Sequence, residues 1–388
     1  EGRRGGRCLP GVEIKLGFCI GYEFLVLGDM KALILVGGYG TRLRPLTLSK
    51  PKPLVEFCNK AMIMHQIEAL VAVGVTEVVL AVNYQPHVME SFLAEEGAKL
   101  GVKITTSKED EPMDTAGPIK LAEKHLNDGE PFFVLNSDVC ADYPFRGMLE
   151  AHASRGAEAT ILITKVDDPS KFGVVLYNEE MMIDRFVEKP KVFCGDKINA
   201  GVYLLSPNVF NRIELRPTSI ERETFPAIAA DNKLFCFELP GHWADVGQPK
   251  DYLTGLGLHL DSQSKTNPAA LVPRGGNIIG NVLIDKTAQV SETAILGPDV
   301  VIGANCVVED GARILGSAVL KGSKVGAHAF VRKTIVGWDS SVGKWARTDN
   351  VTVLGEDVKV KEGVCLNGVK VLPHKSLKED LYEPTIVM

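Results

Sequence analysis

Short apolar runs alternate with segments of helical spacing over the first two thirds of the chain. Continuous apolar runs occupy residues 31–36, 77–82 and 131–135, and a helical pattern extends from about residue 85 to residue 100. Each run has the length of a strand buried on both faces of a parallel sheet. From Met30 to about residue 255 the alternation therefore predicts an α/β, Rossmann-like domain whose parallel sheet is covered by helices.

A different period governs the last third of the chain. Aliphatic residues recur every six positions, and a second series of small or aliphatic residues keeps the same spacing. The series are Ile284, Val290, Leu296, Ile302, Val308, Ile314 and Leu320, and Val282, Ala288, Ala294, Val300, Cys306, Ala312 and Ala318. Beyond residue 320 the register slips, although Val325, Val331, Val336 and Val342 continue it approximately. Hexapeptide repeats of this kind predict a parallel β-helix, in which each turn stacks its aliphatic residues on the next.

These patterns divide the chain into four parts. Residues 1–29 are an N-terminal extension, 30–255 the α/β domain, 256–276 a linker containing Ser, Asn, Pro and Gly, and 277–388 the β-helix. The extension carries three arginines before an apolar stretch, which resembles a signal peptide. Glu23 interrupts that stretch, however, and no A-x-A-like cleavage site follows it. We expect the extension to be disordered and to contribute nothing to function.

The segment 37–53, GGYGTRLRPLTLSKPKP, directly follows the first apolar run. A ligand of a parallel sheet binds at the carboxyl end of such a strand. Gly37, Gly38 and Gly40 let the backbone approach a phosphate closely and direct N–H groups at it, while Arg42 and Lys52 offset the phosphate charge. The segment therefore predicts a grip for a nucleoside triphosphate, and a surface turn with incidental charges is the alternative.

Two better-known glycine loops do not match this segment. A Rossmann fingerprint requires G-x-G-x-x-G at the start of a helix, and a Walker loop ends in G-K-[ST]. Pro45, Pro51 and Pro53 also prevent a regular helix from continuing through the segment. We therefore expect an irregular loop to hold the phosphates.

Two aspartates are candidates for a metal site. Asp138 ends the sequence FFVLNSD at the predicted edge of the sheet, and Asp245 lies far along the chain in HWADVGQPKDY. Mg²⁺ binds through a few carboxylates together with phosphates and waters, so two aspartates are sufficient. A lone aspartate after a strand is more often a turn or cap residue, so the residues alone leave both readings open.

Two further segments carry groups suited to a sugar phosphate. In RFVEKP, Lys189 is flanked by an apolar pair and a proline, so we expect it to be held in place. In NAGVY, Asn199 offers both a donor and an acceptor, and Gly201 permits close approach. The alternative is that Lys189 is only a solvated lysine.

Composition narrows the classes of partner. The formal net charge is -6, which argues against nucleic acid or an anionic membrane as the main partner. No run approaches the length of about 20 apolar residues that spans a bilayer. The eight cysteines are scattered, with no C-x-x-C pair and no histidines at metal spacing, which favours reduced thiols in a cytoplasmic protein.

The segment 37–53 resembles the signature of the nucleoside-diphosphate-sugar pyrophosphorylases, G-G-x-G-T-R-L-x-P-x-T followed by P-K-P. Within that family, the chain from Met30 to Met388 is similar to the GDP-mannose pyrophosphorylases, specifically their catalytic beta subunit. The resemblance implies a left-handed β-helix after the catalytic domain. Because family members usually begin at the residue matching Met30, residues 1–29 look like an added extension.

The resemblance also implies a reaction and its residues. GTP and mannose 1-phosphate would form GDP-mannose and pyrophosphate with Mg²⁺. The implied catalytic residues are Arg42, Lys52 and Lys189; the nucleotide site holds Gly37, Gly38, Gly40, Thr41, Arg42, Gly117 and Asp138; the sugar-phosphate site holds Gly173, Glu188, Lys189, Asn199 and Gly201; the metal ligands are Asp138 and Asp245. N-S-D-V and W-x-D-[IV]-G-x-P-x-D are the motifs that carry the family's metal-binding aspartates.

The chain departs from the family pattern at two positions. Asp114 stands in EPMDTAGP where the pattern L-G-T-A-G has glycine, and Ala61 replaces a customary proline in CNKAMI. In the resembling enzymes the first of these loops lies beside the nucleotide. A carboxylate there would repel phosphates, clash if its φ is positive, or accept a hydrogen bond from guanine.

Three questions stay open at this level. A non-catalytic sensor of GDP-mannose is one alternative function, and a pyrophosphorylase of different nucleotide or sugar specificity is another. Hexapeptide repeats also occur in acyltransferases with a histidine base, and His328 is the one histidine inside the repeats. An assembly or regulatory role for the β-helix is favoured, since the resemblance suggests a homo-oligomer that pairs with a regulatory alpha subunit.

Overall fold

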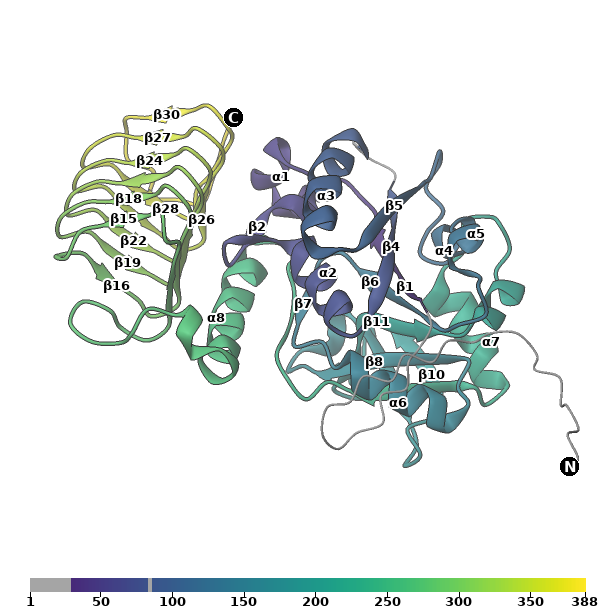
Figure 1. The fold of residues 1–388 in the computed structure, drawn as a ribbon. Helices are drawn as coiled ribbons and strands as arrows, with labels where there is room; N and C mark the ends of the chain where they lie inside the picture. Colours follow the sequence, from purple (N-terminus) through teal and green to yellow (C-terminus); the bar gives the residue numbers. More distant parts are fainter. Residues whose placement is uncertain (1–28, 83–85) are drawn as a thin grey trace, which may run out of the picture.

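The computed structural model describes residues 29–82 and 86–388. An α/β domain and a stack of flat β-helical turns lie side by side, with helix α8 (Pro249–Thr266) between them (Figure 1). The predicted extension falls almost wholly outside the described residues. Over the described ranges, no helix is long and apolar enough to cross a membrane.

The predicted parallel strands form the centre of the α/β domain. Strand β1 (Met30–Val36) pairs in parallel with β4 (Val75–Val82) and β6 (Phe132–Asn136), and β5 (Lys103–Lys108) extends the sheet beyond β4. Ala32 and Ile34 enter the apolar core on one face, and Leu33 enters the core on the other. The unbroken apolar run is thus explained by burial on both faces.

The remaining strands make the sheet mixed instead of wholly parallel. They are β8 (Ala159–Lys165), β9 (Gly173–Tyr177), β10 (Ile183–Glu188), β11 (Lys197–Leu205) and β12 (Leu234–Glu238). Strand β11 runs antiparallel to both β6 and β8, and β9 and β10 form a hairpin. The short turn between β9 and β10 can join only antiparallel neighbours, whereas β12 pairs in parallel with β8.

Helices cover both faces of the sheet. They are α2 (Met62–Ala72), α3 (Pro86–Leu100), α4 (Gly117–Leu121), α5 (Glu123–Leu126), α6 (Phe145–Arg155) and α7 (Phe225–Ala230). Side chains of α2, α3 and α6 enter the first apolar core, and those of α4, α5 and α7 enter the second. The predicted covering of the sheet by helices is confirmed.

The hexapeptide repeats form three parallel sheets, which confirms the predicted β-helical architecture. The first holds β14 (Val282–Ile284), β17 (Val300–Ile302), β20 (Ser317–Val319), β23 (Thr334–Val336), β26 (Thr352–Leu354), β29 (Lys370–Val371) and β31 (Ile386–Val387). The second holds β15 (Gln289–Val290), β18 (Val307–Val308), β21 (Lys324–Val325), β24 (Ser341–Val342), β27 (Lys359–Val360) and β30 (Ser376–Leu377). The third holds β16 (Ile295–Leu296), β19 (Arg313–Leu315), β22 (Phe330–Arg332), β25 (Arg347–Asp349) and β28 (Cys365–Asn367).

The register slip begins earlier than the sequence pattern indicated. Val282 pairs with Val300 three full hexads later, whereas Val300 pairs with Ser317, one residue sooner than three hexads. The missing residue lies at the corner after Ile314. Val319 therefore takes the interior position predicted for Leu320, and Leu320 packs at the contact between the domains.

Residues 256–266, predicted as part of a linker, belong instead to α8. Leu256 and Leu260 of this helix share an apolar cluster with Val301, Ile335 and Val353, which project outward from the first β-helical sheet. Polar residues such as Ser262 and Ser264 concealed the helix, because its apolar residues serve a contact with a distant part of the chain. The irregular connection is confined to the residues that follow Thr266.

Three histidine rings fasten α8 to the α/β domain. His259 of α8 contacts the rings of His65 on α2 and His242 edge to face, with centroids 5.1 and 5.3 Å apart, and it also contacts Phe57. Burial lowers the pKa of His65 to about 4 and that of His259 to about 3, from an ordinary value near 6.5. These rings are therefore neutral at pH 7.

Acid should weaken this contact as the pH falls below about 6.5. A histidine whose pKa is lowered by folding binds its proton more readily in the unfolded chain, so its contribution is complete above about pH 6.5 and falls as the pH drops toward 4. At pH 5 we expect His65 and His259 each to reduce the free energy of unfolding by about 1 to 2 kcal/mol. Urea unfolding at pH 7, 6 and 5 measures this. A free energy that is constant over that range would contradict it.

Candidate active site

The segment 37–53 forms a loop whose later residues pack against Gly40. Its helical pieces are short: η1 (Thr41–Leu43), α1 (Leu46–Ser49) and η2 (Lys52–Leu54). Gly40 has a φ of 59°, and a Cβ there would lie 2.9 Å from the Thr47 methyl group and 3.1 Å from the Lys52 Cβ. The Thr47 hydroxyl donates to the Gly40 carbonyl at 2.7 Å. The expected irregular loop is confirmed, and Gly40 is required by its internal packing.

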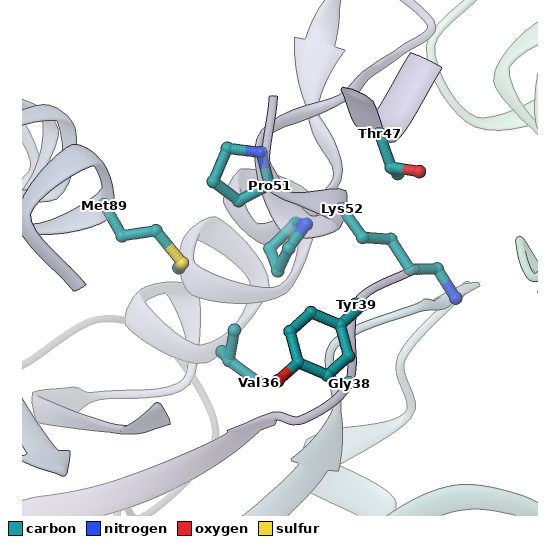
Figure 2. A pocket seen from close by; sticks show the side chains of 8 residues that line it. Val36, Gly38, Tyr39, Thr47, Pro51, Lys52 and Met89 are labelled. Atoms are coloured by element: carbon teal, nitrogen blue, oxygen red, sulfur yellow. The ribbon is translucent and has the colours of Figure 1, made fainter. Parts of the chain in front are cut away.

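Gly37 and Gly38 differ from Gly40 because open space surrounds them. Both are exposed, and an added Cβ would have no neighbour within 4 Å. A pocket beside Gly38 is lined by Val36, Gly38, Tyr39, Thr47, Pro51, Lys52, Pro53 and Met89 (Figure 2). The first two glycines thus leave their backbone open to a ligand, as a phosphate grip requires.

Pairing of two short strands brings the distant aspartates together. Strand β7 (Val139–Ala141) runs antiparallel to β13 (Trp243–Asp245), which places Asp245 opposite Val139. The Val246 N–H donates to the Asp138 carbonyl at 2.9 Å. Residues more than a hundred positions apart are therefore neighbours at the edge of the central sheet.

Two cations stand beside these carboxylates. Lys52 Nζ lies 2.6 Å from Asp138 Oδ2. A Cβ on Gly247 would lie 3.2 Å both from Arg42 Nη2 and from Asp245 Oδ1, so this glycine leaves room for the two side chains to approach. The four predicted groups, Arg42, Lys52, Asp138 and Asp245, thus form one cluster.

Asp245 carries the electrostatic strain of the cluster. Burial and then the neighbouring Asp138 carboxylate raise its pKa to about 6. Its buried Oδ1 accepts no hydrogen bond from the described residues. A buried acceptor without a partner is costly, and a bound cation would satisfy it. No group of three or more metal-binding side chains exists in the described ranges, so the site offers Mg²⁺ two carboxylates only.

A second, open hollow of about 390 Å³ contains most of the predicted sugar-phosphate residues. Its lining is Asp114, Thr115, Lys171, Phe172, Gly173, Glu188, Lys189, Asn199, Ser219, Glu221 and Arg222. Lys189 Nζ lies 3.3 Å from Glu188 Oε1, and a Cβ on Gly173 would lie 3.0 Å from Glu188 Oε2. Gly173 therefore makes room for the Glu188 carboxylate.

Lys189 is fixed through its backbone, while its ammonium is exposed beside Glu188. Its φ is 44°, and its N–H donates to the Phe172 carbonyl at 3.0 Å. The side chain is nevertheless 64 % exposed. The expectation of a rigidly held ammonium is thus met only at the main chain, and the charged end is available to an anion in the hollow.

Both polar atoms of the Asn199 side-chain amide form hydrogen bonds within the protein. Its Nδ2 donates to the Tyr203 hydroxyl at 2.9 Å, and its Oδ1 accepts from the Gly201 N–H at 2.9 Å. Gly201 has a φ of 75°, and a Cβ there would meet Asn136 Nδ2 at 2.6 Å. Asn199 lines the hollow and Gly201 does not, and contact of either residue with a sugar stays a prediction.

The surroundings of Asp114 and Gly117 differ from the nucleotide site that was expected for this segment. Gly117 is buried at the start of α4, where a Cβ would lie 2.5 Å from the Met113 Cβ, so packing alone explains this glycine. Asp114 lines the second hollow and has a φ of 60°. The positive φ shows why the family pattern has glycine at this position. Thr41 is exposed at the start of η1.

Glu221 is the main lining residue that sequence reasoning missed. It lies in a π-helical turn, Ile220–Thr224, and accepts hydrogen bonds from Thr115 Oγ1 at 2.9 Å, Ser219 Oγ at 3.0 Å and the Tyr203 hydroxyl at 3.3 Å. No period or motif marks it, because its donors come from separate elements.

Replacing Asp114 by glycine should stabilise the protein. A non-glycine residue at positive φ is strained, and we expect Asp114→Gly to raise the free energy of unfolding by about 1 kcal/mol. Thermal unfolding measures this. Asp110→Gly is the control, because Asp110 is exposed in the same segment without a positive φ and should gain nothing. An equal gain in both variants would contradict the explanation.

Comparison with known proteins agrees with this geometry. The chain matches the family model for nucleotidyl transferases over residues 31–261 and the GMPPB C-terminal domain over residues 278–387. It is 59% identical to a probable mannose-1-phosphate guanylyltransferase 1 of Oryza sativa subsp. japonica and 56% identical to the mannose-1-phosphate guanylyltransferase catalytic subunit beta of Dictyostelium discoideum, over 92% of this chain and 100% of each relative.

A solved structure resembles the α/β domain. The crystal structure of a putative glucose-1-phosphate thymidylyltransferase from Bacillus anthracis superimposes with a TM-score of 0.54 at 26% identity, covering 58% of this chain and 93% of that one. The family models account for both domains, and the curated relatives match along their entire length. The chain therefore belongs to the nucleotidyl transferase family and, within it, to the mannose-1-phosphate guanylyltransferases.

Proposed function

We propose that this protein forms GDP-mannose and pyrophosphate from GTP and α-D-mannose 1-phosphate, and so supplies a mannosyl donor for glycosylation. The observation that carries the proposal is the cluster of Arg42, Lys52, Asp138 and Asp245 beside the open glycines, in a chain 59% identical to a probable guanylyltransferase over that relative's full length. The second hollow, with Lys189 and Glu188, supports a second anionic substrate.

The reaction is an in-line displacement at phosphorus. A phosphate oxygen of mannose 1-phosphate forms a bond to the α-phosphorus of GTP, and the bond from that phosphorus to the bridging oxygen breaks as pyrophosphate leaves. The attacking phosphate is already an anion, so no strong base is needed. Lys189 orients it, while Arg42 and Lys52 offset charge on the triphosphate and on the leaving group. Positioning and charge neutralisation supply most of the catalysis.

Mg²⁺ is the proposed cofactor. The unpartnered Asp245 Oδ1 and the adjacent Asp138 carboxylate suit a hard cation that also takes phosphates and waters. When bound, the ion would neutralise charge on the phosphates. Lys52, which pairs with Asp138 at 2.6 Å, would stand beside such an ion and the phosphates that it binds.

The partners and the location are proposed on separate grounds. The Dictyostelium relative is a catalytic subunit beta, which supports pairing with a regulatory alpha subunit; the homo-oligomer is proposed from the family resemblance. Among the described cysteines, Cys58, Cys140, Cys194, Cys236, Cys306 and Cys365 are free, which supports a cytoplasmic protein. We propose neither a nucleic acid nor a membrane as a partner.

A non-catalytic sensor of GDP-mannose is the second candidate. A sensor would bind a sugar nucleotide without needing Lys189 and both aspartates at once. A bifunctional acyltransferase has less support, since the His328 ring stacks on Trp345 with centroids 4.3 Å apart and so fills a role in the β-helix itself.

Pyrophosphate release tests the substrates directly. We expect purified protein with Mg²⁺ to release pyrophosphate fastest from GTP with mannose 1-phosphate, when GTP, ATP, UTP and dTTP are each paired with mannose 1-phosphate and glucose 1-phosphate. A faster pair would reassign the specificity. No release from any pair, together with binding of GDP-mannose, would favour the sensor.

Removal of a proposed catalytic group should slow turnover without unfolding the protein. We expect Asp138→Asn and Lys189→Ala each to lower kcat/KM by about a hundredfold or more, because the first removes a charged ligand of the proposed Mg²⁺ and the second removes the cation that orients the attacking phosphate. Lys191→Ala is the matched control, since Lys191 is exposed two residues away and does not line the hollow. Wild-type turnover in either test variant would show that these assignments are wrong.

A further inference from the structure

Trp338 occupies a corner of the β-helix where the fold itself has no need of tryptophan. One corner residue in each of four successive turns accepts a backbone hydrogen bond from the next turn. These equivalent residues are Ala304, Lys321, Trp338 and Glu356, and the donors are the N–H groups of Gly322, Asp339, Asp357 and His374, respectively. The corner therefore accepts alanine, lysine and glutamate in the other turns. At this corner only Trp338 is large and aromatic, and it is 3 % exposed.

The ring of Trp338 is buried against the segment that follows the glycine loop. Its Nε1–H donates to Glu56 Oε2 at 2.5 Å, and Lys50 Nζ lies 4.3 Å from the ring centroid. Lys50 Nζ also lies 2.8 Å from Glu56 Oε1. One tryptophan thus contacts both members of an ion pair, by a hydrogen bond to a charged acceptor and by a cation–π contact.

That ion pair encloses the lysine proposed to bind the triphosphate. Lys50 and Glu56 lie on either side of η2, which begins at Lys52, so their pairing ties together the two ends of the short loop that carries Lys52. Within the loop, the Leu54 N–H donates to Pro51 at 2.9 Å and the Val55 N–H to Lys52 at 3.1 Å. The Tyr252 hydroxyl of α8 holds the Glu56 carbonyl at 2.7 Å.

We propose that Trp338 is a positioning residue for nucleotide binding: through the Lys50–Glu56 pair, the β-helix fixes the loop that aims Lys52 at the triphosphate. The kinetic consequence rests on the proposed function, whereas the ordering of the loop does not. Strand β2 (Glu56–Phe57) lies next to the β-helix and close to α8 (Figure 1). The C-terminal domain thereby contributes to the active site without supplying a residue that touches substrate.

Amide hydrogen exchange tests the ordering of the loop without any substrate. In Trp338→Leu we expect the segment 51–56 to exchange about tenfold faster, since the variant loses a hydrogen bond to a charged group and a cation–π contact. Glu56→Gln should act in the same direction, because it breaks the pair with Lys50 and leaves the Trp338 ring in place. This second variant keeps the test valid if Trp338→Leu folds poorly.

Val353→Ala is the matched control. Val353 is fully buried in the same interdomain cluster, to which neither Lys50 nor Glu56 belongs. It should lower the unfolding temperature while leaving exchange of 51–56 unchanged. Wild-type exchange in both Trp338→Leu and Glu56→Gln, or equal acceleration in Val353→Ala, would overturn the proposal and make Trp338 a packing residue only.

Kinetics supply a readout that packing alone would not produce. We expect Trp338→Leu to lower kcat/KM for GTP by about tenfold and to leave KM for mannose 1-phosphate unchanged. The reason is that no residue of the loop 51–56 lines the second hollow, where mannose 1-phosphate is proposed to bind. Trp338→Phe keeps an aromatic face for Lys50, so its kcat/KM for GTP should lie between those of the wild-type protein and Trp338→Leu. If Trp338→Leu impaired the binding of GTP and of mannose 1-phosphate equally, the result would contradict a specific effect of Trp338 on the loop that carries Lys52.

The two proposals fail in different ways. If the wild-type protein releases no pyrophosphate while Trp338→Leu still accelerates exchange of 51–56, the proposed reaction is wrong and the positioning role of Trp338 in the loop stands. If the wild-type protein turns over normally and neither Trp338→Leu nor Glu56→Gln changes the exchange of 51–56 or kcat/KM for GTP, the reaction stands and the positioning role is wrong.

Discussion

The active site depends on holding two like charges together at the edge of the central sheet. Asp138 and Asp245 are brought together by the pairing of β7 with β13, and burial, followed by repulsion from Asp138, raises the pKa of Asp245. Repulsion of this kind persists only where the surrounding backbone and nearby cations oppose it. Lys52 and Arg42 supply the cations. The folded glycine loop holds these cations in place, and the contacts of Trp338 with Lys50 and Glu56 are proposed to fix the part of it that carries Lys52.

Features with a local cause were predictable from the sequence. The strand at 31–36, the loop at 37–53 and the hexads follow from burial, glycine geometry and aliphatic stacking, which act over a few residues. The predicted phosphate-binding residues Arg42 and Lys52 and the predicted metal ligands Asp138 and Asp245 also lie together, because motifs that follow strands meet at one sheet edge.

Features with a distant cause were not predictable. The mixed sheet depends on a hairpin elsewhere in the chain, and Glu221 depends on donors from three elements. The extension of α8 through residues 256–266 escaped notice because its apolar face is matched by outward-facing residues of the β-helix. The series of period six described the interior of that β-helix, whereas the contact lies on the alternate positions, such as Val301 and Ile335, that point outward.

Helix α8 therefore belongs to two cores at once. It packs Tyr252 and His259 against Phe57 in the α/β domain and places Leu256 and Leu260 among outward residues of the β-helix. A cut between the domains of this chain would therefore expose one of these apolar surfaces to water, so the stability of each domain depends in part on the other through this one helix.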